Sequence, residues 1–220
     1  MQRFDTPTPI SAVLDAPAGR IRLVAADRSD TAVEVLPADA SRGRDVKLAE
    51  RTSVECADGI LRIEAPSKNQ LGHPGSIDVT VQLPTGSHVE AKVASAEFRG
   101  VGQFGDVVFE GAQSAIEIDA AASVRVTTAT GDVSVGRLDG PAEISIAMGD
   151  IRIAEAVHGT VTLATQLGDI SVGAARGVSA SLDAGTTLGR IHNALKNADG
   201  AADLNIHATT TSGDIDARSL

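Results

Sequence analysis

The chain has 220 residues, 42% of them hydrophobic, so it can bury a core as one domain and is too apolar to be disordered. Its formal net charge of −10 excludes nucleic acid and anionic membrane surfaces as preferred partners. Only 2% of the residues are aromatic, and all four of these are Phe, so the usual stacking surfaces for bases and sugar rings are missing.

Targeting signals and cysteine usage bear on the compartment. The first residues lack a positively charged start followed by an apolar stretch, so we expect no secretory signal. No apolar run approaches the ~20 residues of a membrane span. Cys56 is the single cysteine and can form no disulfide within the chain. These features predict a cytoplasmic protein without a membrane span.

Residues 1–85 contain short stretches of alternating apolar and polar residues bounded by Pro, Gly and Asp, a pattern typical of β-strands. The stretches run over 10–16, 19–25, 31–37, 59–66 and 76–84. We expect them to form an irregular β-rich N-terminal cap and the opening rungs of the domain, because an uncapped end would expose unpaired strand edges. The segments 38–50 and 67–75 are expected to be loops or short helices outside this framework.

Residues 86–220 carry a repeat in which Gly, a charged residue and an apolar, any, apolar triplet recur. Its units start at Gly131, Gly149, Gly168, Gly189 and Gly213, with spacings of 18, 19, 21 and 24 residues, and a weaker member starts at Gly105. A second alternating stretch precedes each of these five glycines, at 123–126, 143–146, 160–163, 181–184 and 205–208.

Two short strands and two turns in each repeat are typical of one rung of a mainly parallel β-solenoid. Rungs stacked at about 4.8 Å satisfy each other's backbone groups and should place Val133, Ile151 and Ile170 in one vertical file. The Gly before each Asp is expected at a turn with positive φ. Replacing Gly168 with Val should therefore cost more stability than replacing Ser171 with Val.

The Gly-Asp-Ile/Val repeats, preceded by VTVQLPTGS at 79–87, resemble a bacterial β-strand-repeat family of unknown function whose members carry the name "putative adhesin". The resemblance covers roughly residues 10–220 and implies an all-β fold, a right-handed parallel β-helix, with residues 86–220 as its repeats in one continuous domain. An adhesive role follows only by analogy of fold. The chain departs from its own repeat at Arg190, where Asp is expected, and at Asn193, where an inward apolar residue is expected.

The repeated acid is the sharpest candidate site. Its members, which should fall near one line of turns, are Asp132, Asp150, Asp169 and Asp214. Stacked carboxylates could bind calcium, but one Asp in each rung supplies few oxygen ligands, so we favour a turn role in which each side chain bonds nearby backbone. Arg190, between Asp169 and Asp214 in the sequence, would relieve the repulsion between them.

Other polar groups are weaker candidates. Arg190, His192 and Asn193 form a polar cluster on the least regular rung, where Asn193 either shapes a small pocket or simply ends a strand. Cys56 is expected to be a buried, unreactive strand residue. The remaining histidines lack ligand spacing and are expected at the surface: His73, His88, His158 and His207. We assign no catalytic, cofactor-binding or metal-binding residue.

These observations predict a non-enzymatic scaffold or binding module that binds an unknown protein or associates with itself, with no small-molecule ligand or cofactor. One alternative is a surface adhesin exported by an unseen route. The other is a polysaccharide-active β-helix enzyme, which would need paired carboxylates such as Glu143 with Asp183. Their separation depends on the register of the rungs.

Overall fold

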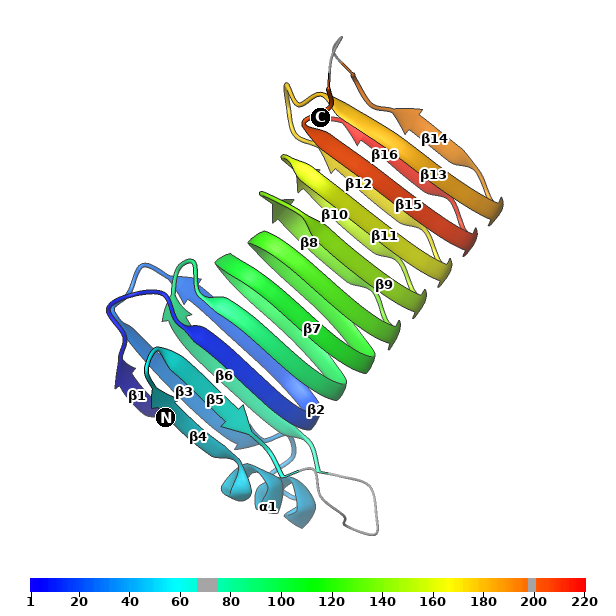
Figure 1. Ribbon diagram of the computed structural model, residues 1–220. Coiled ribbons are helices and arrows are strands. Elements are labelled where there is room, and N and C mark those ends of the chain that lie inside the picture. Colours follow the sequence, from blue (N-terminus) through cyan, green and yellow to red (C-terminus); the bar gives the residue numbers. More distant parts are fainter. Residues whose placement is uncertain (67–74, 198–200) are drawn as a thin grey trace.

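The computed structural model describes residues 1–66, 75–197 and 201–220, and it shows two walls of β-strands wound into a flattened column (Figure 1). The strands of the first part are β1 (Gln2–Asp5), β2 (Ser11–Ala26), β3 (Asp30–Pro37), β4 (Ser53–Ala57), β5 (Ile60–Glu64) and β6 (Ile77–Pro84). Those that follow are β7 (His88–Thr130), β8 (Val133–Leu138), β9 (Ala142–Met148), β10 (Ile151–Ala156), β11 (Gly159–Leu167), β12 (Ile170–Ala174), β13 (Ala180–Leu188), β14 (Ile191–Ala194), β15 (Leu204–Ser212) and β16 (Ile215–Ser219).

Each wall is a ladder of strands that lie one above another. Wall A follows the order β4-β5-β2-β7-β9-β11-β15-β13, and wall B follows β1-β3-β6-β2-β7-β8-β10-β12-β16-β14. The long strands β2 and β7 turn the corners and belong to both walls. Along each wall, from β2 to the far end of the column, neighbouring strands pair in parallel. The prediction of an all-β, solenoid-like fold is confirmed.

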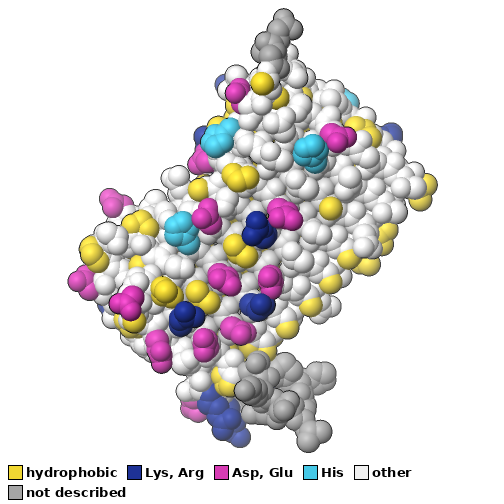
Figure 2. Space-filling view, viewed as in Figure 1, with side chains coloured by type: hydrophobic (Ala, Val, Ile, Leu, Met, Phe, Trp, Pro, Cys, Tyr) yellow, Lys and Arg dark blue, Asp and Glu magenta, His cyan; other side chains and the backbone are white. Residues whose placement is uncertain are grey.

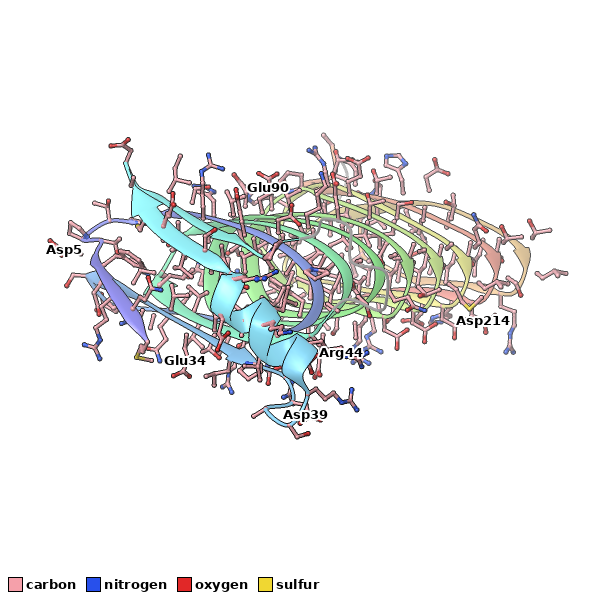
Figure 3. The ribbon with its side chains drawn as sticks, turned by 90° about the horizontal axis from the view of Figure 1, so that it is seen from below. Asp5, Glu34, Asp39, Arg44, Glu90 and Asp214 are labelled. Carbon is pink, nitrogen blue, oxygen red and sulfur yellow. The ribbon has the colours of Figure 1, made fainter. Side chains whose placement is uncertain are left out.

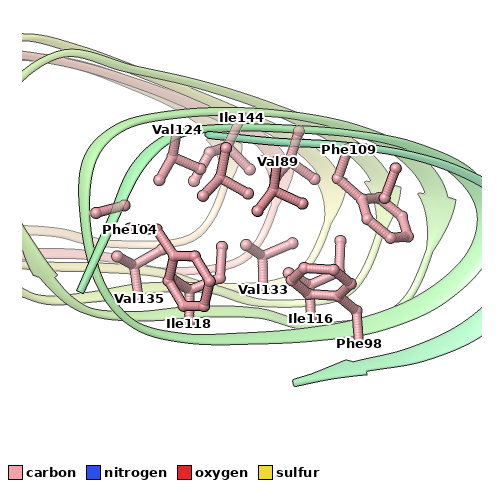
Figure 4. Packing of buried hydrophobic residues seen from close by; sticks show 14 of the residues in the cluster. Val89, Phe98, Phe104, Phe109, Ile116, Ile118, Val124, Val133, Val135 and Ile144 are labelled. Atoms are coloured by element: carbon pink, nitrogen blue, oxygen red, sulfur yellow. The ribbon is translucent and has the colours of Figure 1, made fainter. Parts of the chain in front are cut away.

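The core lies between the walls and follows the predicted files. Val133 is in register with Ile151, and Ile151 with Ile170, so these three residues stand in one file, and all are buried. Alternation within each strand sends every second side chain inward, where small aliphatic groups fill a narrow space. The column also holds larger rings, since Phe98 and Phe109 meet edge to face with centroids 5.4 Å apart (Figure 4).

The first end of the column is closed by elements that break the parallel pattern. β1 pairs with β3, β3 with β6 and β4 with β5, all antiparallel. Helix α1 (Gly43–Arg51) contacts β3 and β6 and lies across this end (Figure 3). It overlaps segment 38–50, for which the sequence predicts a loop or a short helix, and extends one residue beyond it; buried Leu48 anchors it. Of segment 67–75, only residue 75 lies within the described residues.

The far end of the column departs from sequence order. β15 pairs with β11 on one side and with β13 on the other, and β16 pairs with β12 and β14. The rung formed by β15 and β16 is therefore inserted between the β11–β12 rung and the β13–β14 rung (Figure 1). We call β13 and β14 the terminal rung. β14 ends at Ala194, and residues 198–200 of the connection to β15 lie outside the described part.

Candidate functional site

The repeated acids form a continuous hydrogen-bonded ladder. One carboxylate oxygen of Asp132 accepts the backbone N–H of Asp150 (2.9 Å), and Asp150 accepts that of Asp169 (2.8 Å). Asp169 then accepts the N–H of Asp214 at 2.7 Å, as the inserted rung requires. The sequence predicted a bond to nearby backbone, whereas the structure gives a bond to the next rung. Each acid thus holds two rungs together at the turn, a structural role.

Arg190 ends this ladder instead of interrupting it. The prediction that it lies between Asp169 and Asp214 is wrong, because Asp214 sits directly next to Asp169 and Arg190 lies beyond Asp214. The Arg190 backbone N–H donates to Asp214 Oδ1 (2.8 Å), and its guanidinium donates to Asp214 Oδ2 (3.3 Å). No rung follows β14 in the described part of the chain. An Asp at position 190 would therefore find no backbone N–H of a next rung to accept.

Asn193 and His192 also belong to the terminal rung. Asn193 is in register with buried Ala217, which confirms an inward position, but it is exposed because no strand covers β14 among the described residues. Its side chain accepts the backbone N–H of Leu195 at 3.0 Å, which ends the strand. His192 Nδ1 lies 3.0 Å from Asp216 Oδ2. These contacts tie both side chains to neighbouring residues of the rung and of β16.

A second ladder, which the sequence analysis missed, is made of threonine hydroxyls beside the turn glycines. Thr165 donates to the carbonyl oxygen of Gly149, and Thr210 donates to that of Gly168, both at 3.1 Å. Thr186 repeats the bond to Gly213 at 3.1 Å. The sequence contains this signal at 164–167 (ATQL), 185–188 (GTTL) and 209–212 (TTTS). Each of these runs holds a Thr a few residues before the glycine of the turn.

Charged side chains on the outside of the walls pair between rungs. Arg125 and Glu143 on wall A form an ion pair at 3.2 Å, and Arg137 and Glu155 on wall B form one at 2.8 Å. Other pairs of this kind are Lys92–Glu110, Arg99–Glu117 and His207–Asp183. These groups are largely exposed, so each pair adds little stability. Their consequence is that the walls present alternating charges in place of a field of one sign.

A groove on wall A has a volume of about 490 Å³ and is lined by residues of β7, β9 and β11. Ser123, at its edge, donates to Asp106 Oδ1 at 2.6 Å, and the Asp106 backbone N–H donates to His88 Nδ1 at 3.1 Å. In a catalytic triad the histidine stands between the hydroxyl and the acid. Here the Asp106 carboxylate stands between Ser123 and His88, so the order of a triad is reversed and the histidine does not face the hydroxyl.

The paired carboxylates proposed for sugar cleavage lie in one file but far apart. Glu143 is in register with Thr162, Thr162 with His207, and His207 with Asp183. Three rungs at ~4.8 Å separate the two acids by roughly 14 Å, beyond the ~5 to 9.5 Å of glycosidase carboxyl pairs. Glu143 also pairs with Arg125, and Asp183 with His207. The pair therefore does not have the geometry for that chemistry.

Cys56 lies on the edge strand β4 and is half-buried, so the prediction of a fully buried residue is wrong in degree. It packs against the core, and desolvation raises the pKa of its thiol above the ordinary value. A raised thiol pKa lowers reactivity. In the described ranges, no three His, Cys, Asp or Glu side chains gather as metal ligands. A helix long and apolar enough to cross a membrane is likewise missing from these ranges.

One exposed apolar feature follows a corner of the column, next to the turn glycines. Met148 is in register with Leu167, Leu167 with Ser212, and Ser212 with Leu188. The three apolar side chains are 53%, 49% and 68% exposed in that order. We call Met148, Leu167 and Leu188 the edge stripe. Figure 2 shows hydrophobic side chains along this right-hand edge, beside a front face of mixed charges and small polar groups.

The comparisons agree with the predicted resemblance. The model of the Toastrack family DUF4097 matches residues 71–219. A putative adhesin from Parabacteroides distasonis ATCC 8503 has a similar structure, with a TM-score of 0.55 at 12% identity, covering 98% of this chain and 95% of its own. A putative adhesin from Bacteroides fragilis NCTC 9343 gives 0.53 at 14% identity with coverage of 98% and 95%. No curated protein matches. At these identities the two structures show the fold alone.

Proposed function

Because the chain belongs to the Toastrack family DUF4097, we propose that it is a non-enzymatic β-solenoid module that binds another protein along the side of its column. The column holds the binding residues at fixed spacing and takes no part in covalent chemistry. The right-handed coil implied by the resemblance is part of this proposal. So is a cytoplasmic location, which the single thiol Cys56 supports.

The observation that carries the proposal is the edge stripe. Large apolar side chains that recur at one register and stay about half exposed or more indicate a surface that a partner covers. Stacking fixes their spacing, and the tight turns beside them limit the entropy lost on binding.

A surface adhesin is the second candidate, favoured by the names of the similar structures from Parabacteroides distasonis and Bacteroides fragilis. The same stripe would then face a partner outside the cell. Fractionation of the source cells separates the two functions, because a protein found only at the surface contradicts the cytoplasmic module. A carbohydrate-active enzyme is less well supported, since Glu143 and Asp183 lie three rungs apart. Turnover of soluble polysaccharides that Glu143→Gln abolishes would restore that candidate.

The stripe can be tested with a matched pair of double variants. Met148→Lys with Leu167→Lys changes two stripe residues, and Ser145→Lys with Thr162→Lys adds the same charge to exposed positions of wall A. Proteins captured from native lysate by each variant and by the wild type are compared by mass spectrometry. We expect a protein that the wild type and the wall variant retain and the stripe variant loses. A partner retained equally by all three would contradict the proposed surface.

A further inference from the structure

The terminal rung leaves the end of the hydrophobic core only partly covered: Leu195 packs against it, and the Lys196 oxygen accepts the Ala180 N–H. Ile191 continues the file of Ile170 and Ile215, yet it is 46% exposed whereas Ile215 is 1% exposed. On wall A, Leu182 and Ala184 continue buried files but are only half-buried. β13 pairs only with β15, and β14 only with β16, so one edge of each strand has no strand beside it in the described structure. Such an edge accepts a further strand readily.

The two ends of the column are therefore unlike. At the first end, antiparallel strands β1, β3 and β4 and helix α1 cover the core (Figure 3). At the far end, Leu188 and Ile191 flank the last turn and remain exposed. A second copy stacking head to tail would meet the cap, which offers no continuation of the parallel rungs. This excludes a simple filament and leaves the far end as the surface for association.

The residues at the far end also disfavour a further parallel rung. In each inner rung, an Asp accepts the N–H of the next rung, but position 190 holds Arg, which has no acceptor. An antiparallel strand uses a different hydrogen-bond pattern and does not depend on this ladder.

Charge permits two copies to meet at this end. The whole chain carries −10, but residues 180–197 carry one acid, Asp183, against Arg190 and Lys196, a formal charge of +1 with His192 neutral. Asp183 is already beside His207, with 3.4 Å between Oδ2 and Nδ1. When two molecules join at this end, most of their negative charge lies away from the contact. Electrostatic repulsion therefore opposes this contact less than it would oppose a contact between acidic parts of the two molecules.

From these observations we propose that two copies of the chain join tail to tail through their terminal rungs, as a twofold dimer. Turning one column end over end reverses its strands, so β13 of one copy runs antiparallel to β13 of the second. The pairing supplies partners for the outer backbone edge of β13 beyond Ala180, whose N–H already donates to Lys196, and it covers Leu188 and Ile191. The two cores then become one continuous core across the contact, closed at both ends by a cap.

Light scattering after size exclusion, over a series of concentrations, measures the association. The test variant is Leu188→Lys with Ile191→Lys, both exposed in the single chain, so folding should be kept. The control is Met148→Lys with Leu167→Lys, which adds the same charge at similar exposure but away from the end. We expect a wild-type dimer, an unchanged dimer in the control, and a dissociation constant raised by about tenfold or more in the test variant.

Small-angle scattering distinguishes the mode of association. A tail-to-tail dimer nearly doubles the longest dimension of the particle, whereas side-by-side association widens it. A wild-type monomer at all concentrations, a dimer that the test variant does not weaken, or a widened particle would each overturn the proposal. Circular dichroism confirms that both variants keep their strands. Because the end variant and the stripe variant differ, failure here is separable from failure of the proposed binding function.

Discussion

Gly168→Ala tests the close stacking of the turns. Gly168 has φ +148°, and a β-carbon there would lie 2.0 Å from the carbonyl oxygen of Gly149 in the rung before it. Ordinary contact begins at 3.4 Å, so the two turns would have to separate by roughly 1.4 Å. That separation would break the bond from the Gly149 N–H to the Leu167 oxygen (2.9 Å) and the Asp169–Asp150 ladder bond (2.8 Å).

The expected cost has two sources. A non-glycine residue at this φ costs about 1 to 3 kcal/mol. Two hydrogen bonds weakened at about 1 kcal/mol each add about 2 kcal/mol. Gly168→Ala should therefore lower the free energy of unfolding by about 3 to 5 kcal/mol, among the larger effects of single substitutions. Gly168→Val should cost more, whereas Ser171→Val changes an outward, half-buried position on a strand and should cost little.

Three other glycines separate the two sources. At Gly177, φ is +80° and the space is open, so Ala should cost only about 1 kcal/mol, for φ alone. Gly173 lacks a positive φ, but a β-carbon would lie 2.2 Å from the Ala154 oxygen, so crowding alone acts there. Gly185 has neither feature, so Ala there should leave stability unchanged or slightly raised.

Urea denaturation followed by circular dichroism ranks the four variants by their midpoints. The expected order of loss is Gly168 first, then Gly173 and Gly177, with Gly185 last. If Gly168→Ala and Gly185→Ala unfolded at the same urea concentration, the turns would not be stacked as described, and the solenoid register would be wrong at this corner.

Four further outcomes are expected. Asp169→Asn keeps an acceptor for the Asp214 N–H and should change the melting temperature little, whereas Asp169→Ala should cost about 1 kcal/mol; equal losses would contradict the ladder's role. Thr210→Val removes the donor to Gly168 and should cost about 1 kcal/mol in urea, and an unchanged midpoint would show that the bond adds nothing. Burial raises the pKa of Cys56, so its thiolate fraction at alkaline pH is below that of a free thiol, and iodoacetamide should label it more slowly in the native protein than in urea; labelling at equal rates would show an unprotected thiol. The same raised pKa means that Cys56 contributes stability below the ordinary thiol pKa that is lost as pH rises through the folded value.

Much of the fold could be predicted from the sequence because one rung determines the next. The period of two within each strand fixed which side chains point inward, and the glycine punctuation aligned Val133, Ile151 and Ile170. The cap was predicted only as a region, since antiparallel pairing of β1, β3 and β4 leaves no repeat in the residues. The division at residue 85 stays a prediction.

The order of the last rungs could not be predicted from the periodicity. A sequence repeat shows that its units stack on one another. Because the units are alike, the repeat does not show which unit stacks on which. The signal lay in the exceptions, because Arg190 and Asn193 fit a rung that has nothing beyond it. The bonds of the Asp ladder were likewise expected within a turn, since one rung considered alone offers no other backbone.

The inserted rung sets an order of events during synthesis. Residues 180–194 leave the ribosome before residues 204–219, but in the described part of the chain β13 and β14 pair with no strands other than the two that those later residues form. Until those strands form, β13 and β14 lack the neighbours that they have in the folded column, and Leu182 and Ile191 lack the files that they continue. When β15 and β16 form, they supply the partners of β13 and β14. The last two rungs are therefore expected to form together, whereas the earlier rungs can add one at a time.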